Sequence, residues 1–362
     1  MNNLENLINK KVLITGNTGF KGAWLSILLD ELGADVYGLA DKIPWENGIF
    51  SKKSISKVVN QSWIDILDYQ KVQKLIKKIK PDFVFHLAAQ PLVLESHISP
   101  RETFLTNING TVNILESIRK VNPSIPLIII TSDKVYKNDE KGIFFDESNE
   151  LKGKDPYSAS KSCAEIVAYS YQESFSEMRI ATARSGNVIG GGDWSNFRII
   201  PDIVKSIIQN KKPILRNPTS TRPWLYVLDV CKGYVDIAVK LNQQNKSSIL
   251  NYNLAPTFQK VVNVKELTQK LIYQFGRKEI EIKNSVCQKK ESKILNLNCK
   301  RAIKELGWKN YFGINEAISE TSKWYKTTIE ENNPYDITKY QVKKFLDQIF
   351  GQEPLKKIKI KN

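Results

Sequence analysis

The sequence predicts an α/β protein built on a doubly wound parallel sheet, with a smaller mixed α/β lobe toward the carboxyl terminus. Apolar runs such as Val12–Ile14, Phe83–Phe85 and Ile128–Ile130 lack the polar alternation of a half-exposed strand. Strands that are buried on both faces of a parallel sheet have this composition. Because stretches with helical spacing separate the runs, right-handed crossovers would bring each strand back parallel to the previous one.

The turn Thr15–Gly22 follows the first apolar run and contains Gly16, Gly19 and Gly22. After the turn, apolar residues recur at helical spacing until Gly33 ends the helix. A strand, a glycine-rich turn and a helix, in that order, form the fingerprint of a dinucleotide site. The glycines let the backbone approach a pyrophosphate, which the amides at the helix amino terminus bind. A dinucleotide cofactor is therefore favoured over a plain tight turn.

The second strand, residues 35–39, leads to Asp41 and Lys42. A carboxylate about 20 residues beyond the glycines binds the adenosine ribose hydroxyls of NAD. Asp41 fits that position, whereas Lys42 is suited to the 2′-phosphate of NADP. The pattern favours NAD and leaves NADP as the alternative.

The next elements are a short strand over residues 63–66, a helix over 69–78 and a fourth strand that begins at Phe83 and ends in small residues. Small residues at a strand end permit the close approach of a ligand. His86 lies within the apolar run of the fourth strand. This position favours a core histidine with satisfied hydrogen bonds over a catalytic one.

A long helix is predicted over residues 100–121, and the fifth strand after it ends in Ser132, Asp133 and Lys134. Ligands bind at the carboxyl ends of parallel strands. A hydroxyl, a carboxylate and an amine therefore stand where chemistry is expected. The alternative is a loop in which Ser132 and Asp133 only cap a turn.

The helix over residues 155–175 carries Tyr157 and Lys161, which project from one face because they are four residues apart. A phenol has a pKa of about 10, and a nearby ammonium lowers this pKa by favouring the phenolate. Such a phenolate can take the proton of a sugar hydroxyl while hydride leaves the same carbon. Tyr-x-x-x-Lys is common on helices by chance, but a dinucleotide fingerprint upstream favours a functional pair.

The domain organisation is predicted as a cofactor domain over residues 1–185, rejoined by a strand near residues 248–254, and an interleaved substrate lobe over 186–335. A sixth strand at residues 180–184 closes the first part, and residues 336–362 are predicted to be a basic tail. Helices of the lobe are expected at residues 264–275, 300–306 and 314–325.

A proline-bearing loop over residues 216–224 contains Arg216 and Arg222. Arginine binds anions in a bidentate way, which suits the pyrophosphate of a sugar nucleotide. Asn187 and Arg198 are further candidates for substrate binding.

The net charge of +16 arises largely from lysines scattered over helical stretches. Such lysines indicate solvated helix faces and favour an anionic substrate over nucleic acid. Two histidines and four widely spaced cysteines predict no bound metal. No apolar run approaches the roughly 20 residues of a membrane span, and the amino terminus lacks the pattern of a signal peptide. These features predict a cytoplasmic protein.

These motifs together resemble the extended short-chain dehydrogenase/reductase family over about residues 10 to 330. The resemblance rests mainly on Thr15-Gly16-x-x-Gly19-x-x-Gly22, His86-Leu87-Ala88-Ala89, Thr106-Asn107-x-x-Gly110-Thr111 and Tyr157-x-x-x-Lys161. It implies a Rossmann-type domain, NAD as cofactor and a homodimer formed through the helices near 100–121 and 157–175. It also implies a set of cofactor contacts, with adenine against Asp65 and Ile66: Gly16, Thr18, Gly19, Phe20, Gly22, Asp41, Asp65, Ile66, Leu87, Ala88, Ala89, Gln90, Thr106, Tyr157 and Lys161.

Within that family, Ser132 with Tyr157 and Lys161 resembles the set that an epimerase needs for redox chemistry at C4. Asp133 and Lys134 add two proton carriers, as in sugar 4,6-dehydratases. By this resemblance Asp133 is the acid for the C6 hydroxyl, which requires a raised pKa. Lys134 stands where thymidine-linked hexose dehydratases have glutamate, either as the base at C5 or as a stabiliser of an enolate.

Residues 132–136, 186–194 and 216–224 are similar to CDP-glucose 4,6-dehydratases. The resemblance implies CDP-glucose as substrate, CDP-4-dehydro-6-deoxyglucose and water as products, and a pathway to the deoxysugars of lipopolysaccharide O-antigen. Physical reasoning alone does not distinguish cytosine from thymine or uracil. The alternatives are a 4-epimerase, a dehydratase of another nucleotide sugar, and a cofactor-binding regulatory or RNA-associated protein.

Overall fold

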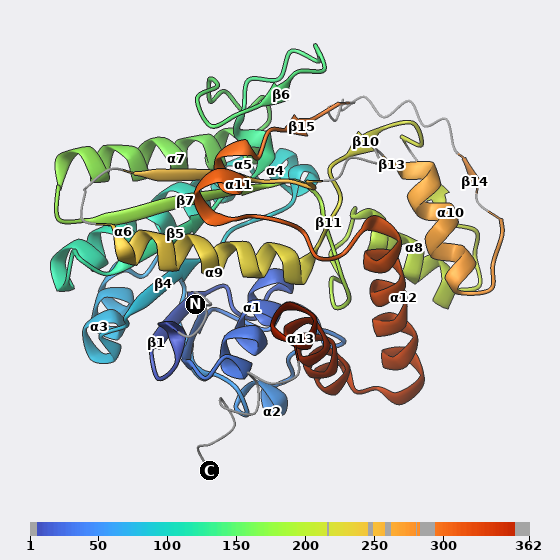
Figure 1. Ribbon diagram of the computed structural model, residues 1–362, viewed down its shortest axis with the longest axis horizontal. Helices are drawn as coiled ribbons and strands as arrows, with labels where there is room; N and C mark the ends of the chain where they lie inside the picture. The colour runs from blue at the N-terminus through green and yellow to red at the C-terminus, as the bar shows by residue number, and fades with distance from the viewer. Residues whose placement is uncertain are drawn as a thin grey trace.

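The computed structural model describes residues 6–215, 217–244, 249–257, 262–279, 281–282 and 294–351. Its centre is a seven-stranded sheet in the order β12-β7-β5-β4-β1-β2-β3, in which all neighbouring strands are parallel (Figure 1). This is the doubly wound Rossmann-type arrangement that the sequence predicts. The strands are β1 Lys11–Thr15, β2 Asp35–Ala40, β3 Asn60–Trp63, β4 Phe83–His86, β5 Pro126–Ile130, β7 Arg179–Ser185 and β12 Leu250–Leu254.

The central strands read as continuous apolar runs because each face of the sheet has its own core. Leu13, Val84 and Ile129 point to one hydrophobic cluster, whereas their neighbours Ile14 and Phe85 belong to the other. Successive side chains of a strand point to opposite faces of the sheet. When helices cover both faces, every side chain of the strand is buried, and apolar residues are favoured at every position.

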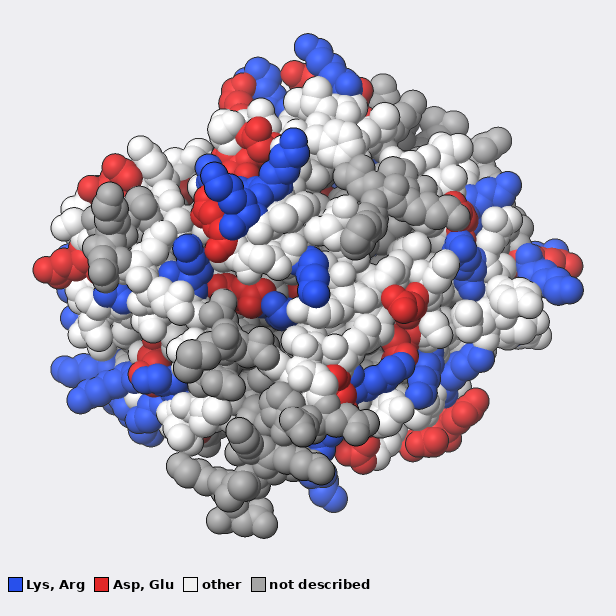
Figure 2. Space-filling view, in the orientation of Figure 1, with Lys and Arg blue, Asp and Glu red and all other residues white. Residues whose placement is uncertain are grey.

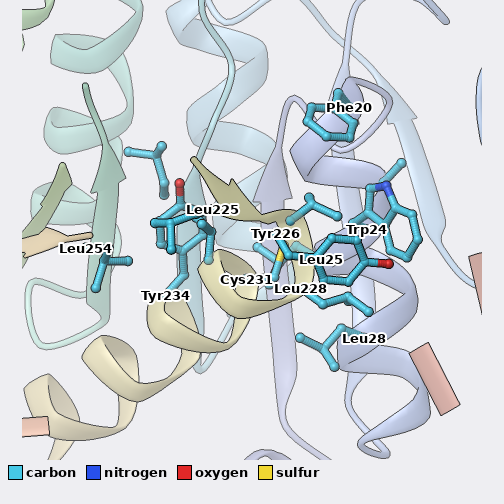
Figure 3. Close-up of a cluster of buried hydrophobic side chains, with 14 of the residues drawn as sticks. Phe20, Trp24, Leu25, Leu28, Leu225, Tyr226, Leu228, Cys231, Tyr234 and Leu254 are labelled. Carbon is cyan, nitrogen blue, oxygen red and sulfur yellow. The ribbon is translucent and has the colours of Figure 1, made fainter. Parts of the chain in front are cut away.

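Helices cover both faces of the sheet, and in Figure 1 α7 lies above it and α9 below. The face of α9 (Val227–Gln243) also holds α1 (Phe20–Glu31), and these two helices pack against each other. Figure 3 shows this packing, in which Trp24, Leu25 and Leu28 lie close to Leu228 and Tyr226. The opposite face is covered by α3 (Tyr69–Ile79), α6 (Gly110–Val121) and α7 (Pro156–Ser174).

The remaining strands form short pairs beyond the main sheet. Three of these described pairs are parallel, and one pair is antiparallel. The pairs are β6 (Phe144–Phe145) with β15 (Asn296–Leu297), β8 (Val188–Ile189) with β11 (Leu225–Tyr226), β9 (Ile214–Leu215) with β14 (Glu281–Ile282), and the antiparallel β10 (Thr221–Arg222) with β13 (Val262–Asn263). The other helices are α2 Lys52–Ile55, α4 Val93–Ile98, α5 Pro100–Phe104, α8 Ile199–Ile208, α10 Val264–Gln274, α11 Lys300–Leu306, α12 Ile314–Glu331 and α13 Pro334–Phe350.

Two sequence predictions about these elements are confirmed. The strand expected near Leu250 is β12, which pairs with β7 and so rejoins the first sheet. His86 is a buried core residue, with Thr15 Oγ1 at 2.7 Å from Nδ1 and Thr111 Oγ1 at 3.1 Å from Nε2. Burial lowers the pKa of His86 to about 3, so the ring stays neutral.

One other prediction is wrong in its bounds, and a second has the right bounds but did not include a change of helix type inside them. The third strand ends at Trp63 instead of running over residues 63–66, because the Asp65 carboxylate accepts the Leu67 amide at 2.9 Å and turns the chain. The helix expected over residues 100–121 contains a π-helical turn, Leu105–Asn109. The extra residue of a π-turn changes which side chains face inward, and Asn107 is buried there.

The prediction of a basic tail over residues 336–362 is also wrong for its first part. Residues 334–350 form α13, which packs against α1 and α12. Its Val342, Phe345 and Leu346 are buried, so this helix completes the core beneath α1. The last lysines of the predicted tail lie outside the described residues.

Charge on the surface is dispersed. Figure 2 shows Lys and Arg side chains interspersed with Asp and Glu over one face of the molecule. Helix α3 buries Val72, Ile76 and Ile79 while Lys71 and Lys78 are exposed, as expected for a solvated helix face. In the part of the chain that the structure describes, no helix is both long and apolar enough to cross a bilayer.

Candidate active site

One pocket, with a volume of about 260 Å³, lies where β5 and β7 end and the chain passes into the shorter strand pairs. Its wall brings together residues that are up to 244 positions apart in the sequence, from Phe20 to Val264. The predicted site residues that line it are Ser132, Asp133, Lys134, Tyr157, Asn187, Arg198, Arg222 and, from the glycine-rich turn, Phe20.

The segment after β5 places three polar side chains in this wall. Ser132 caps a 3₁₀ turn over Asp133–Val135, and its Oγ accepts the Lys134 amide at 3.2 Å. The same Oγ donates to Asp133 Oδ1 at 2.9 Å. Ser132 therefore caps the turn and also lines the pocket, so capping is not its only structural role.

Asp133 is buried, with 4% of its surface exposed. Burial raises the pKa of its carboxyl, and the charge of Lys134 and the Ser132 hydrogen bond oppose that rise. A carboxyl with a raised pKa keeps its proton to a higher pH than usual. This is the direction that an acid role requires.

Helix α7 supplies Tyr157 and Lys161. The Asp155 side chain caps the helix by accepting the Ser158 amide at 2.9 Å, so Tyr157 lies in the first turn. Lys161 Nζ donates to the Ile130 carbonyl at 3.1 Å. Burial, followed by the charge of Lys21, lowers the pKa of Lys161 to about 7.

The expectation that Lys161 lowers the pKa of Tyr157 is wrong in this structure. Burial raises the pKa of the Tyr157 phenol, and the largest opposing influence is the charge of Lys21, followed by the Ser132 hydrogen bond. Because the pKa of Lys161 is lowered to about 7, Lys161 is neutral at the higher pH at which the Tyr157 phenol loses its proton. The cation that favours the phenolate most is thus Lys21.

Sequence reasoning missed Lys21, which lies inside the glycine-rich turn and lines the pocket. Its Nζ donates to the Tyr234 hydroxyl at 3.0 Å, and burial lowers its pKa. A signal was present in the sequence. A lysine in the first turn of a helix opposes the helix dipole, so its charge needs another purpose.

The glycine-rich turn forms a tight backbone cradle between β1 and α1. Gly16 has φ +70°, and a Cβ there would lie 2.7 Å from the Ala88 amide nitrogen. A Cβ on Gly22 would lie 2.2 Å from the Gly16 carbonyl oxygen. The buried Asn17 Oδ1 in the same turn has no hydrogen-bond partner. A tight turn with an unsatisfied acceptor at a helix amino terminus fits a dinucleotide with polar groups.

The predicted adenosine end lies beyond β2 and β3. Asp41 is exposed, and its carboxylate lies 3.7 Å from Lys42 Nζ. The backbone carbonyl of Lys42 accepts a hydrogen bond from the Thr18 hydroxyl at 2.7 Å. Asp65 is exposed, whereas Ile66 is buried and packs toward Gly110. Asp41 and Lys42 follow β2, and Asp65 and Ile66 follow β3, so these four residues lie beyond the carboxyl ends of those strands.

The predicted contacts with the cofactor backbone follow β4. Leu87, Ala88, Ala89 and Gln90 are partly exposed there, and the Gln90 amide donates to Asn107 Oδ1 at 2.8 Å. Thr106 lies in the π-helical turn that carries Asn107.

Three of the predicted substrate residues, Asn187, Arg198 and Arg222, line the pocket. Arg198 pairs with Asp193 at 3.2 Å and also donates to the Pro91 carbonyl at 3.5 Å. Arg222 is 9% exposed and donates to the Thr221 carbonyl at 2.8 Å. Asn187 accepts the Leu225 amide through its carbonyl. Arg216 lies outside the described residues.

The family model of GDP-mannose 4,6 dehydratase matches residues 13–321. CDP-glucose 4,6-dehydratase of Salmonella typhimurium is 36% identical over 345 residues, covering 93% of this chain and 96% of that protein. dTDP-D-glucose 4,6-dehydratase of Homo sapiens is 27% identical, covering 88% and 90%.

Solved structures of low sequence identity share the fold. UDP-glucose 4-epimerase of Thermotoga maritima, solved with UDP-glucose, superposes with a TM-score of 0.78 at 19% identity, covering 88% of this chain and 99% of that one. dTDP-glucose 4,6-dehydratase of Bacillus anthracis, solved with NAD, gives 0.75 at 23% identity, covering 89% and 98%.

A parallel Rossmann-type sheet with a glycine cradle and a Ser132, Tyr157 and Lys161 set defines an extended short-chain dehydrogenase/reductase. The resemblance seen in the sequence is thus confirmed. More narrowly, the chain belongs to the GDP-mannose 4,6-dehydratase family.

Proposed function

We propose that this protein dehydrates CDP-D-glucose to CDP-4-dehydro-6-deoxy-D-glucose, with NAD as a cofactor that is regenerated in each turnover. The observation that carries the proposal is the placement of Ser132, Asp133, Lys134 and Tyr157 in the wall of one pocket. A 4-epimerase needs no acid at C6, whereas Asp133 has the raised pKa of one. The 36% identity to a CDP-glucose 4,6-dehydratase over 93% of the chain supports the choice of nucleotide.

The cradle of Gly16, Gly19 and Gly22 would hold the NAD pyrophosphate, and Asp41 would bind the adenosine ribose. NAD bound there would supply the acceptor for the C4 hydride and the donor for the hydride that C6 needs. No external oxidant or reductant is consumed, so the cofactor should stay bound between turnovers.

Proton transfers fall to the chain's own side chains. Tyr157 takes the proton of the C4 hydroxyl, which Ser132 orients. The C4 ketone acidifies the C5 proton, which Lys134 removes while Asp133 protonates the departing C6 hydroxyl as water. A proton from Lys134 or solvent then returns to C5 when C6 receives the hydride. The presence of both Lys134 and Asp133 in the pocket lining supports these two roles.

The substrate's pyrophosphate would bind Arg198 and Arg222, which also line the pocket. The net charge of +16 adds a favourable field for an anionic sugar nucleotide.

Turnover of CDP-, dTDP-, UDP- and GDP-glucose with NAD, followed by mass spectrometry, tests the proposal. We expect loss of one water from CDP-glucose at the highest kcat/KM. Unchanged mass with a new sugar would identify an epimerase, and a faster loss of water from another nucleotide would reassign the base. Salt-sensitive RNA binding without turnover of any sugar nucleotide would favour the regulatory alternative.

Cofactor binding should fail in Gly22→Ala. The added Cβ would lie 2.2 Å from the Gly16 carbonyl oxygen, which forces the backbone of the cradle apart. Overpacking of this kind costs about 1–3 kcal/mol. Titration calorimetry with NAD should show weakened binding in this variant. Gly313→Ala is the matched control, because its Cβ would meet nothing closer than Glu316 at 3.6 Å. Wild-type affinity for NAD in Gly22→Ala would show that the glycine-rich turn does not hold the NAD pyrophosphate.

A homodimer formed through α7 and its neighbours is part of the proposal, as is a cytoplasmic role in the supply of deoxysugars for surface polysaccharide. Ile166 and Tyr169 on α7 are each 54% exposed, and Ile98 on the adjoining α4 is 69% exposed. Large apolar side chains that are exposed side by side mark interaction surfaces.

Tyr169→Glu should therefore shift the protein from dimer to monomer in sedimentation experiments, because a carboxylate would be buried at the centre of the interface. Tyr273→Glu on α10 is the control, since Tyr273 is 70% exposed but lies on another helix. An unchanged dimer in the Tyr169 variant would place the interface elsewhere.

A further inference from the structure

A buried ion pair lies directly behind the pocket. Arg184 on β7 and Glu165 on α7 are each 2% exposed, and the two side chains meet in a bidentate way, with Nε to Oε1 at 2.9 Å and Nη2 to Oε2 at 2.8 Å. The hydroxyls of Thr131 and Thr182 also donate hydrogen bonds to the Glu165 carboxylate, at 2.5 Å and 2.7 Å respectively. Buried charges persist only when they are paired and hydrogen-bonded in this way.

The pair is linked to both ends of the Ser132–Lys134 segment. Thr131, which donates to Glu165, directly precedes Ser132. At the other end, Arg184 Nη1 donates to the Tyr136 hydroxyl at 2.8 Å, and that hydroxyl donates to Asn253 Oδ1 at 2.7 Å. The three pocket residues are therefore held between two anchors that share one buried ion pair.

The same helix that carries Tyr157 also fixes this segment. Glu165 lies on α7 eight residues after Tyr157. Ser162 of α7 donates to the Val135 carbonyl at 2.8 Å, and Lys161 donates to the Ile130 carbonyl. Helix and segment are thus tied at several points, so the position of Tyr157 relative to Asp133 depends on these bonds.

We infer that Glu165 and Arg184 are positioning residues, which act through Thr131 and Tyr136 to hold the Ser132–Lys134 segment at the correct distance from Tyr157. This inference rests on the proposed function. Reacting groups must be placed to within a fraction of an ångström, and a displacement of about 1 Å can cost about 100-fold in rate. Loss of one anchor should therefore lower kcat more than it raises KM.

Thr131→Val and Thr182→Val form a matched test, because each removes one hydroxyl from the same carboxylate and only Thr131 adjoins Ser132. We expect both variants to lose similar thermal stability. Thr131→Val should lower kcat about 10-fold with little change in KM, whereas Thr182→Val should keep kcat within about two-fold of wild type. Thr131→Ser retains a hydroxyl and should restore kcat.

Tyr136→Phe provides a second arm, since it cuts the other anchor and keeps the ring that stacks on Phe145. We expect a similar loss of kcat. Equal kcat in the Thr131→Val and Thr182→Val variants, or a wild-type kcat in Tyr136→Phe, would overturn the inference about positioning. The proposed function would still stand in that case, provided that the wild-type protein turns over CDP-glucose. Absence of wild-type turnover on every nucleotide sugar would overturn both.

Discussion

Replacing Tyr157 with phenylalanine should lower kcat on CDP-glucose by about 10²–10⁴-fold, the usual contribution of a positioned acid–base group. Tyr157 is 9% exposed, and phenylalanine keeps its buried ring while it removes the group that takes the C4 hydroxyl proton. The fold should survive, which thermal unfolding checks. Because burial raises the pKa of Tyr157, wild-type kcat should rise with pH as the phenol loses its proton, and this rise should vanish in the variant.

Tyr252→Phe is the matched control. Tyr252 is also buried, on a strand outside the pocket. Its replacement by phenylalanine removes a single hydrogen bond, which the Tyr252 hydroxyl donates to Glu305 at 2.7 Å. Its kcat should match wild type. A Tyr157→Phe enzyme that keeps kcat within about 10-fold, at wild-type stability, would show that another group handles the C4 proton.

Asp133→Asn should separate the steps of the reaction. Asparagine has the shape of aspartate and can still bond to Ser132, but it has no acidic proton to give to the C6 hydroxyl. We expect water loss to fall by about 10²–10⁴-fold. Tyr157 and Lys134 remain, so the C5 proton should still exchange with solvent deuterium, as measured by mass spectrometry of recovered substrate. Water loss at the wild-type rate in this variant would remove Asp133 from the mechanism.

Lys134→Ala completes the comparison. If Lys134 is the base at C5, this variant loses the exchange of the C5 proton that Asp133→Asn keeps. Exchange at an undiminished rate would assign Lys134 to stabilising an enolate instead.

The sequence predicts much of the fold because apolar runs and helical spacing are local signals. The strand at residues 126–130 and the helix at 300–306 lie where those signals place them. The π-turn at Leu105–Asn109 was not foreseeable, since it depends on Asn107 bonding to Ser160 at 2.8 Å and to Gln90, both distant in sequence. Helix α13 was missed because its lysine content hid its buried apolar stripe.

Eight of the residues predicted for the site line one pocket, but the electrostatics of that pocket could not be predicted from the sequence. Spacing along a helix indicates that Tyr157 and Lys161 share a face, but only the folded chain shows that Lys21 lies close enough to oppose the burial of Tyr157. The ion pair of Glu165 and Arg184 was also hidden. A single Glu and a single Arg on different elements carry no pattern until a helix packs on a strand.

Incubation of the wild-type protein with NAD and CDP-glucose in deuterated water, read by mass spectrometry, tests the central claim most directly. The account predicts a product that has lost one water and carries deuterium at C5. A product of unchanged composition with only its sugar configuration altered would contradict the dehydration.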